Sequence, residues 1–114
     1  MSNCDVKVAE VLQTAYKSLM RQGVDVVEFL NLLMLFRKFF FDNISDAIDA
    51  DLIECYSLDD GTWFFHINLC DFVSAEECAD LNDKWQDVMI DWMYADKLTR
   101  RRVLDHVSVG FNYS

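Results

Sequence analysis

The sequence predicts an α+β fold that is mainly α, with two antiparallel N-terminal helices, a central β-hairpin and a long acidic amphipathic helix. Its 114 residues, 53% of them hydrophobic, suit a single domain spanning 1–114. The lack of proline and the presence of only three glycines favour long helices joined by short connections. Apolar residues recur with helical spacing through most of the chain, and only the middle has the aromatic and β-branched composition typical of strands.

The first helix is expected over Asp5–Gln22. Its apolar residues recur at intervals of three and four, which predicts one stripe facing the core. These residues are Val8, Val11, Leu12, Ala15 and Leu19. Gly23 follows, and glycine adopts the left-handed conformation at a helix end at little cost. The helix should therefore end at this point.

A second helix is expected from Asp25 to about Phe41. Asp25 is a suitable N-cap, and Glu28 three residues later completes a variant of the capping box. The helix is apolar nearly all round, which indicates burial at the centre of the fold or at a subunit interface. We expect a central core helix. A homodimer interface is the alternative, because so short a chain has limited material to cover its phenylalanines, Phe36, Phe39, Phe40 and Phe41.

The middle of the chain is expected to hold a short helix and then a hairpin. Ser45 would cap the helix, which ends near Leu52. The two strands are expected over Leu52–Leu58 and Thr62–Leu69, because residues 59–61 between them read Asp-Asp-Gly, a strong hairpin signal.

A two-residue Asp-Gly turn would fix the register of this hairpin. Leu58 would then pair with Trp63. Tyr56 would pair with Phe65, on the same side of the hairpin, and these pairs would pack onto the helices. The other side would carry Ser57, Phe64, Cys55 and His66.

The acidic amphipathic helix is expected over Ser74–Asp96, with Ser74 as N-cap and Glu77 at the capping-box position. One side of it is apolar and is formed by Cys78, Leu81, Trp85, Val88, Met89 and Trp92. The opposite side carries five carboxylates, which we call the acidic stripe: Glu76, Asp80, Asp83, Asp87 and Asp91.

After Asp96 the chain becomes basic, with Lys97, Arg100, Arg101 and Arg102. Several interpretations of this run are open: a solvated helix face, a clamp on the negative C-terminal end of the acidic helix, or a contact with the acidic stripe of a second subunit. The run could touch nucleic acid only if the acidic residues pointed away. The last segment, Val103–Ser114, fits either a helix end with an irregular tail or a late strand.

The sequence lacks the motifs of an enzyme, a metal site or a membrane protein. It has two histidines, no glycine-rich phosphate loop and no nucleophile elbow, so we expect no catalysis and no cofactor. His66 and Cys55 could face each other across the hairpin, but no paired ligands at the short spacing of zinc sites occur. Residues 42–54 lack the glycine at position six and the acid at position twelve of a calcium loop. The longest unbroken apolar run, Leu32–Phe36, is too short to span a membrane.

The strongest signal for function is charge. The net charge is −10, and residues 42–96 contain fifteen acids and one base. Such a surface repels phosphate, so we expect no direct nucleic-acid binding, whereas a basic partner would be attracted. The four cysteines are expected to be free thiols in a reducing cytosol, since the N-terminus lacks the apolar core of a signal peptide.

The spacing of the acidic stripe is unusual for a helix surface. Its members form like-charged pairs at i+3 and i+4, and four of the five are aspartates, which are poor mid-helix residues. The stripe would run about 22 Å at 1.5 Å per residue. One DNA strand presents six or seven phosphates over that length, at about 3.4 Å each. A second acidic row could come from Asp42, Asp46 and Asp49.

These features predict a small cytoplasmic protein that binds and inhibits a nucleic-acid-binding protein through a DNA-mimicking carboxylate surface. In size, acidity and lack of catalytic motifs the chain resembles small phage proteins that inhibit restriction enzymes, CRISPR effectors or host polymerase. The partner would be a basic surface of such an enzyme, in the host cytoplasm if a phage encodes the protein. Two alternatives are open: a solvated face kept acidic for solubility, and a homodimeric structural or adaptor protein that associates through the second helix.

Overall fold

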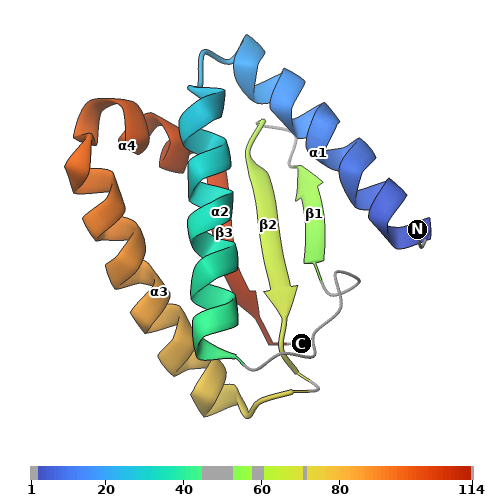
Figure 1. Cartoon of the computed structure of the whole chain (residues 1–114), viewed down its shortest axis with the longest axis vertical. Helices are drawn as coiled ribbons and strands as arrows, with labels where there is room; N and C mark the ends of the chain where they lie inside the picture. The colour runs from blue at the N-terminus through green and yellow to red at the C-terminus, as the bar shows by residue number, and fades with distance from the viewer. Residues whose placement is uncertain (1–2, 45–52, 58–60, 71, 114) are drawn as a thin grey trace.

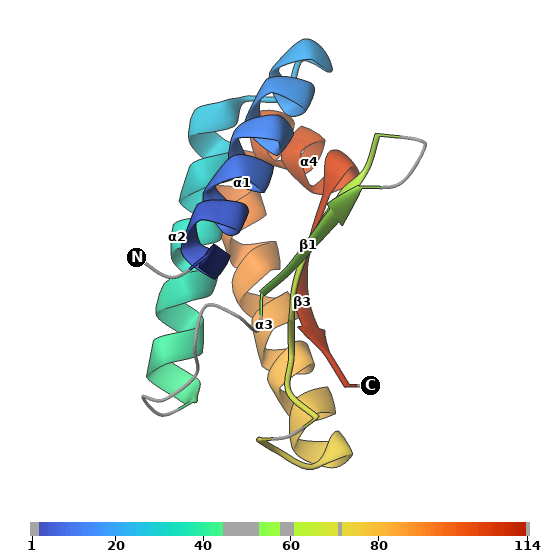
Figure 2. The ribbon, with the colours of Figure 1, turned by 90° about the vertical axis from the view of Figure 1, so that its right-hand side faces the viewer.

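The computed structural model describes residues 3–44, 53–57, 61–70 and 72–113, and in these residues the chain forms four helices and three strands. The elements are α1 (Asn3–Arg21), α2 (Val26–Asn43), β1 (Ile53–Ser57), β2 (Trp63–Asn68), α3 (Ala75–Ala95), α4 (Lys97–His106) and β3 (Val107–Asn112). The helices all cover one face of a single sheet (Figures 1 and 2), so the predicted α+β, mainly α class is confirmed. The expected short helix at 45–52 lies outside the described residues.

The two N-terminal helices run in opposite directions, as predicted, and a tight turn joins them (Figure 1). Gly23 ends α1 with a φ of 78°, the left-handed conformation expected of a glycine there. Asp25 caps α2, because its carboxylate accepts hydrogen bonds from the backbone N–H groups of Val27 and Glu28. The side chain of Glu28 does not complete the capping box, since it is bound to Arg100 instead.

The hairpin forms, but its predicted register is wrong by one residue. Ser57 pairs with Trp63 and Cys55 pairs with Phe65, so five residues separate the strand ends rather than two. Side chains alternate between the two faces of a sheet, and a shift of one residue therefore moves every side chain of β1 to the opposite face. Cys55 faces the helices, whereas Tyr56 lies on the open face and stacks on Phe64 at 4.9 Å between ring centroids.

The C-terminal segment is a strand, which resolves the alternative left open by its sequence. β3 pairs with β2 in parallel, with Trp63 opposite Val107 and Ile67 opposite Phe111. The sheet order is β1-β2-β3, so β2 is central and β3 adds a third strand to the predicted hairpin. α3 and α4 form the crossover that a parallel pair of strands requires.

The core lies between the sheet and helices α2 and α3. Trp85 of α3 is 1% exposed and packs on Phe36 and Phe39 of α2, with ring centroids 4.9 and 5.4 Å apart. The ring centroids of Phe111 in β3 and Phe36 lie 5.1 Å apart. Phe29 of α2 packs on the sheet through another ring-to-ring contact. The long acidic helix is therefore packed on the second helix, as predicted, and also on β3.

The outer edge of β3 is closed by side chains of α3. The indole Nε1 of Trp85 donates to the carbonyl oxygen of Val109 at 2.9 Å. Asn82 binds Phe111 twice: its Nδ2 donates to the carbonyl oxygen at 2.9 Å, and its Oδ1 accepts from the backbone N–H at 3.0 Å. These bonds satisfy backbone groups that would otherwise be unpaired at the edge of the sheet.

The hydrogen bond from Trp85 can be tested against a matched tryptophan. Trp63 is also buried, but within the described chain its Nε1 has no hydrogen-bond partner. Both Trp→Phe substitutions remove similar volume, and only Trp85→Phe leaves a buried carbonyl unpaired. We expect Trp85→Phe to lower the free energy of unfolding by about 1–3 kcal/mol more than Trp63→Phe does, measured by urea denaturation. Equal losses would show that the bond to Val109 contributes nothing.

Candidate functional site

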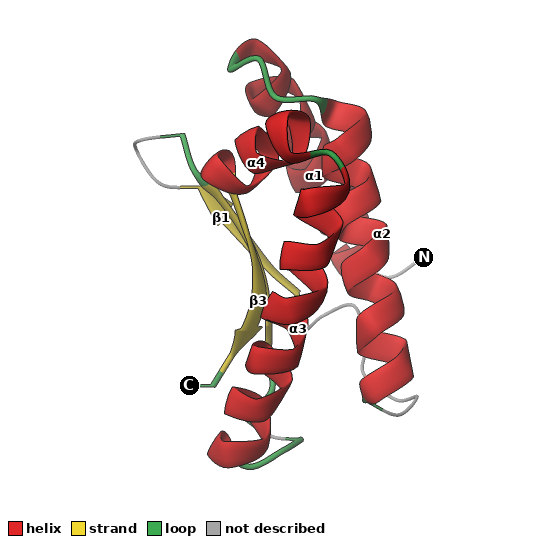
Figure 3. Ribbon diagram, turned by 90° about the vertical axis from the view of Figure 1, so that its left-hand side faces the viewer, coloured by secondary structure: helices red, strands yellow, loops and turns green. Residues whose placement is uncertain are grey.

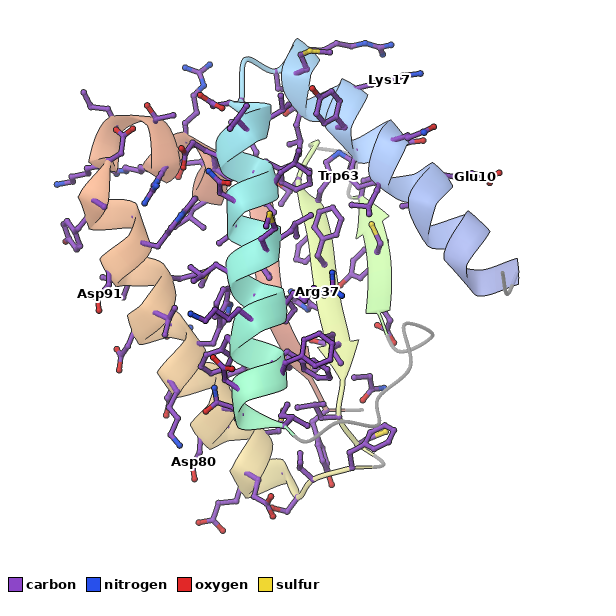
Figure 4. All side chains as sticks on the ribbon, in the orientation of Figure 1. Glu10, Lys17, Arg37, Trp63, Asp80 and Asp91 are labelled. Carbon is purple, nitrogen blue, oxygen red and sulfur yellow. The ribbon has the colours of Figure 1, made fainter. Side chains whose placement is uncertain are left out.

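The acidic stripe lies along the exposed side of α3, as predicted. All five carboxylates belong to exposed residues, whereas Cys78 and Trp85 on the opposite side are buried. Figure 4 shows Asp80 and Asp91 pointing outward from α3 and away from the rest of the molecule. The helix begins at its predicted cap, where Ser74 Oγ accepts from the backbone N–H of Glu77 at 3.2 Å.

Among the residues that the structure describes, no salt bridge reaches the acidic stripe. Arg100 and Glu28 form the sole ion pair among the residues that the structure describes, and neither belongs to the stripe. Lys84, the single base of α3, is exposed on the same side as the acidic stripe, four residues after Asp80 and three before Asp87. The five carboxylates therefore face solvent with one lysine among them, and the row is strongly acidic and available to an external cation or basic surface.

The predicted second acidic row is represented by Asp42 alone, which is exposed on the last turn of α2. The two residues after it, Asn43 and Ile44, line a shallow pocket together with Glu77 and Asp80 of α3. The C-terminal end of α2 thus meets the first two turns of α3, and Asp42 lies at that end of the stripe. The other two predicted members of the second row, Asp46 and Asp49, lie outside the described residues.

The basic run includes the clamp that its sequence suggested. Arg100 of α4 donates from Nη1 to the carbonyl oxygen of Trp92, in the last turn of α3, at 2.6 Å. Its Nε binds Glu28 of α2 at 2.6 Å, and its guanidinium lies 4.6 Å from the centroid of the Trp92 ring. A cation at the negative end of a helix is stabilising, and this one also ties three helices together. Lys97, Arg101 and Arg102 are exposed beside it.

The pairing of Cys55 with His66 is wrong, because the register places them on opposite faces of the sheet. His66 lies on the open face, where Nδ1 is 2.8 Å from Asn112 Oδ1 and Nε2 is 3.1 Å from Ser108 Oγ. Both ring nitrogens are thus engaged by β3. Within the described part of the chain no three His, Cys, Asp or Glu side chains are grouped to hold a metal ion.

Comparison with known proteins gives no match to a protein-family model, to a curated protein or to a solved structure. None of the helices in the described ranges combines the length and the apolar character needed to cross a membrane. The functional interpretation therefore depends on the surfaces of this chain alone.

A second surface lies on α2, the helix for which the sequence left a homodimer interface open as the alternative to a central core position. Phe36, Phe39 and Phe40 are buried, but four other apolar residues face solvent on the side of α2 that points away from the sheet. We call them the outer stripe: Val27, Leu30, Met34 and Phe41. The sequence signal for them is weak because the helix is apolar nearly all round. Only the polar residues on the same side, such as Lys38, mark it as exposed.

The partial burial of Cys55 against the helices gives a testable difference in thiol chemistry. Burial raises its pKa from 9.0 to about 11, because the thiolate is poorly solvated. Below that pKa the thiol stays protonated, so we expect its alkylation by iodoacetamide to remain slow through pH 9 and to accelerate toward pH 11. In the urea-unfolded chain the acceleration should occur near pH 9. Peptide mapping by mass spectrometry measures the rates, and far-UV circular dichroism checks folding at each pH. Rapid labelling at pH 8 in the folded chain would contradict this account.

Proposed function

We propose that this protein binds and inhibits a nucleic-acid-binding protein by presenting the acidic stripe of α3 to the surface that holds phosphates in that partner. The observation that carries the proposal is a row of five exposed carboxylates with no cation of the described chain paired to it. The protein would act in the cytoplasm, that of the host cell if a phage encodes it, and would carry out no reaction.

Rigidity supports this role. The inner side of α3 is fixed by Trp85 and Asn82, so the carboxylates are held in line before any partner arrives. A preorganised row loses less conformational entropy on binding than a flexible acidic segment would. The carboxylate spacing approaches that of phosphates on one DNA strand, and the net charge of −10 would steer a basic partner toward the protein.

The cost of the stripe argues against solubility as its purpose. Like charges at i+3 and i+4 destabilise a helix by about 0.2–0.5 kcal/mol for each pair. Glutamates mixed with lysines would keep a surface soluble without that cost. A row made mostly of aspartates has short side chains that hold their charges close to the backbone, which suits a fixed geometry. Asp42 would support the stripe at one end, and Asp46 and Asp49 are proposed to do the same.

The stripe can be tested by removing charge at its centre. We expect the triple substitution Asp80→Asn, Asp83→Asn and Asp87→Asn to abolish capture of the partner from bacterial lysate by the immobilised protein. The wild-type protein should capture a nucleic-acid-binding protein at low salt and release it at high salt. The same substitutions relieve like-charge repulsion, so the free energy of unfolding should rise.

The matched control removes three exposed carboxylates elsewhere, Glu10→Gln, Glu54→Gln and Asp105→Asn, and so changes the net charge equally. This control should capture the partner as the wild-type protein does. Equal capture by the stripe variant and the wild-type protein would overturn the proposal. Equal loss in both variants would mean that net charge, rather than the stripe, attracts the partner.

A further inference from the structure

The outer stripe of α2 is an apolar surface open to solvent and is bordered on one side by α1, whose Leu12 and Tyr16 line a hollow together with Leu30. Val27 is 64% exposed, Leu30 43%, Met34 70% and Phe41 54%. Between Glu28 and Asp42 the helix carries no acid, and its charged residues there are Arg37 and Lys38. In a chain with a net charge of −10, this is therefore a face on which two copies can approach with little repulsion. Contiguous exposed apolar residues of this kind mark interaction sites.

The spacing of the exposed side chains is symmetric about Met34. Val27 and Phe41 lie seven residues to either side of it, and Leu30 and Lys38 lie four residues to either side. A two-fold axis through Met34 would therefore place each exposed side chain of one α2 opposite an exposed side chain of an antiparallel second α2. We propose that the outer stripe binds a second copy of this chain, with the two α2 helices packed face to face in antiparallel orientation.

This pairing gives each exposed side chain a suitable neighbour. Val27 of one copy meets Phe41 of the other, and the two Met34 side chains meet on the axis. Leu30 meets Lys38 of the other copy, whose methylene stem covers apolar surface while its ammonium group reaches water. No two like charges are brought opposite each other. The interface is isologous, as in most homodimers.

The dimer would also supply a second acidic row, a consequence that rests on the proposed function. α3 lies beside α2 rather than on its outer face (Figure 1). The two-fold axis lies in the plane of the interface, perpendicular to α2. Rotation about it keeps both copies of α3 on the same side of the dimer and reverses the direction of one. Two acidic stripes would then run antiparallel on one surface, as the two strands of a DNA duplex do.

The interface is limited by the length of α2. Its 18 residues span about 27 Å. A contact between two helices of this length lies near the lower end of the areas buried in specific interfaces. The dimer should therefore be reversible and should depend on protein concentration, which sedimentation equilibrium can measure on the full chain.

A charged residue placed at the two-fold axis tests whether the dimer forms. Met34→Glu would place two unpaired carboxylates against each other, and we expect the dimer dissociation constant to rise by about 100-fold or more. The matched control is Met20→Glu, which changes an exposed methionine of α1 outside the stripe and should leave the dimer intact. A wild-type chain that sediments as a monomer at every concentration would overturn the proposal, as would equal effects of the two substitutions.

Disulfide trapping determines the orientation. Met34→Cys should form a covalent dimer with itself, whereas Val27→Cys and Phe41→Cys should cross-link only when mixed, with the wild-type chain reporting any background from native thiols. Self-cross-linking of Val27→Cys would mean parallel helices and would overturn the antiparallel arrangement.

The triple variant of the acidic stripe distinguishes this proposal from the proposed function, because it should dimerise normally even though it captures no partner. Full capture by monomeric Met34→Glu would refute the second-row consequence and leave the stripe itself supported.

Discussion

The attachment of α3 to the edge of β3 is the interaction on which the rest of the structure depends. Trp85 and Asn82 lie on one side of α3 and bind the backbone of Val109 and Phe111. These bonds close the edge of the sheet, and the indole ring also fills the core between α2 and β3. Because a helix has a fixed period, anchoring one side determines which residues face solvent. The rotation that buries Trp85 is therefore the rotation that exposes the five carboxylates of the acidic stripe.

A second constraint fixes the far end of α3. β3 must return parallel to β2, so the chain has to turn sharply between α3 and α4 (Figure 3). Arg100 stabilises this turn by binding the last turn of α3 through Trp92 and the first turn of α2 through Glu28. The pair is partly buried, and its geometry is supported by the stacking of the guanidinium on the Trp92 ring. α3 is thus held at its end by Arg100 and along its length by the sheet, which makes its exposed side a rigid surface.

The parts of the fold that depend on local spacing could be predicted from the sequence, and those that depend on distant contacts could not. The helices, their caps at Asp25 and Ser74, and the exposed side of α3 follow from residues a few positions apart. The predicted hairpin register is wrong because register depends on the length of the connection between β1 and β2. That connection has five residues, whereas the prediction assumed a two-residue turn. β3 pairs with a strand some forty residues earlier in the chain, and nothing in its own residues specifies that partner. The exposure of Met34 was missed for a related reason, since an apolar helix does not show from its sequence which side packs.

Competition with DNA determines whether the acidic stripe occupies the site where a partner holds nucleic acid. A protein captured from lysate by the immobilised chain would be exposed to increasing amounts of a short duplex DNA at constant salt. We expect the duplex to release the captured protein, and free chain to displace the duplex in turn, because both bind one basic surface. A captured protein that binds the duplex and the chain at the same time would contradict the claim.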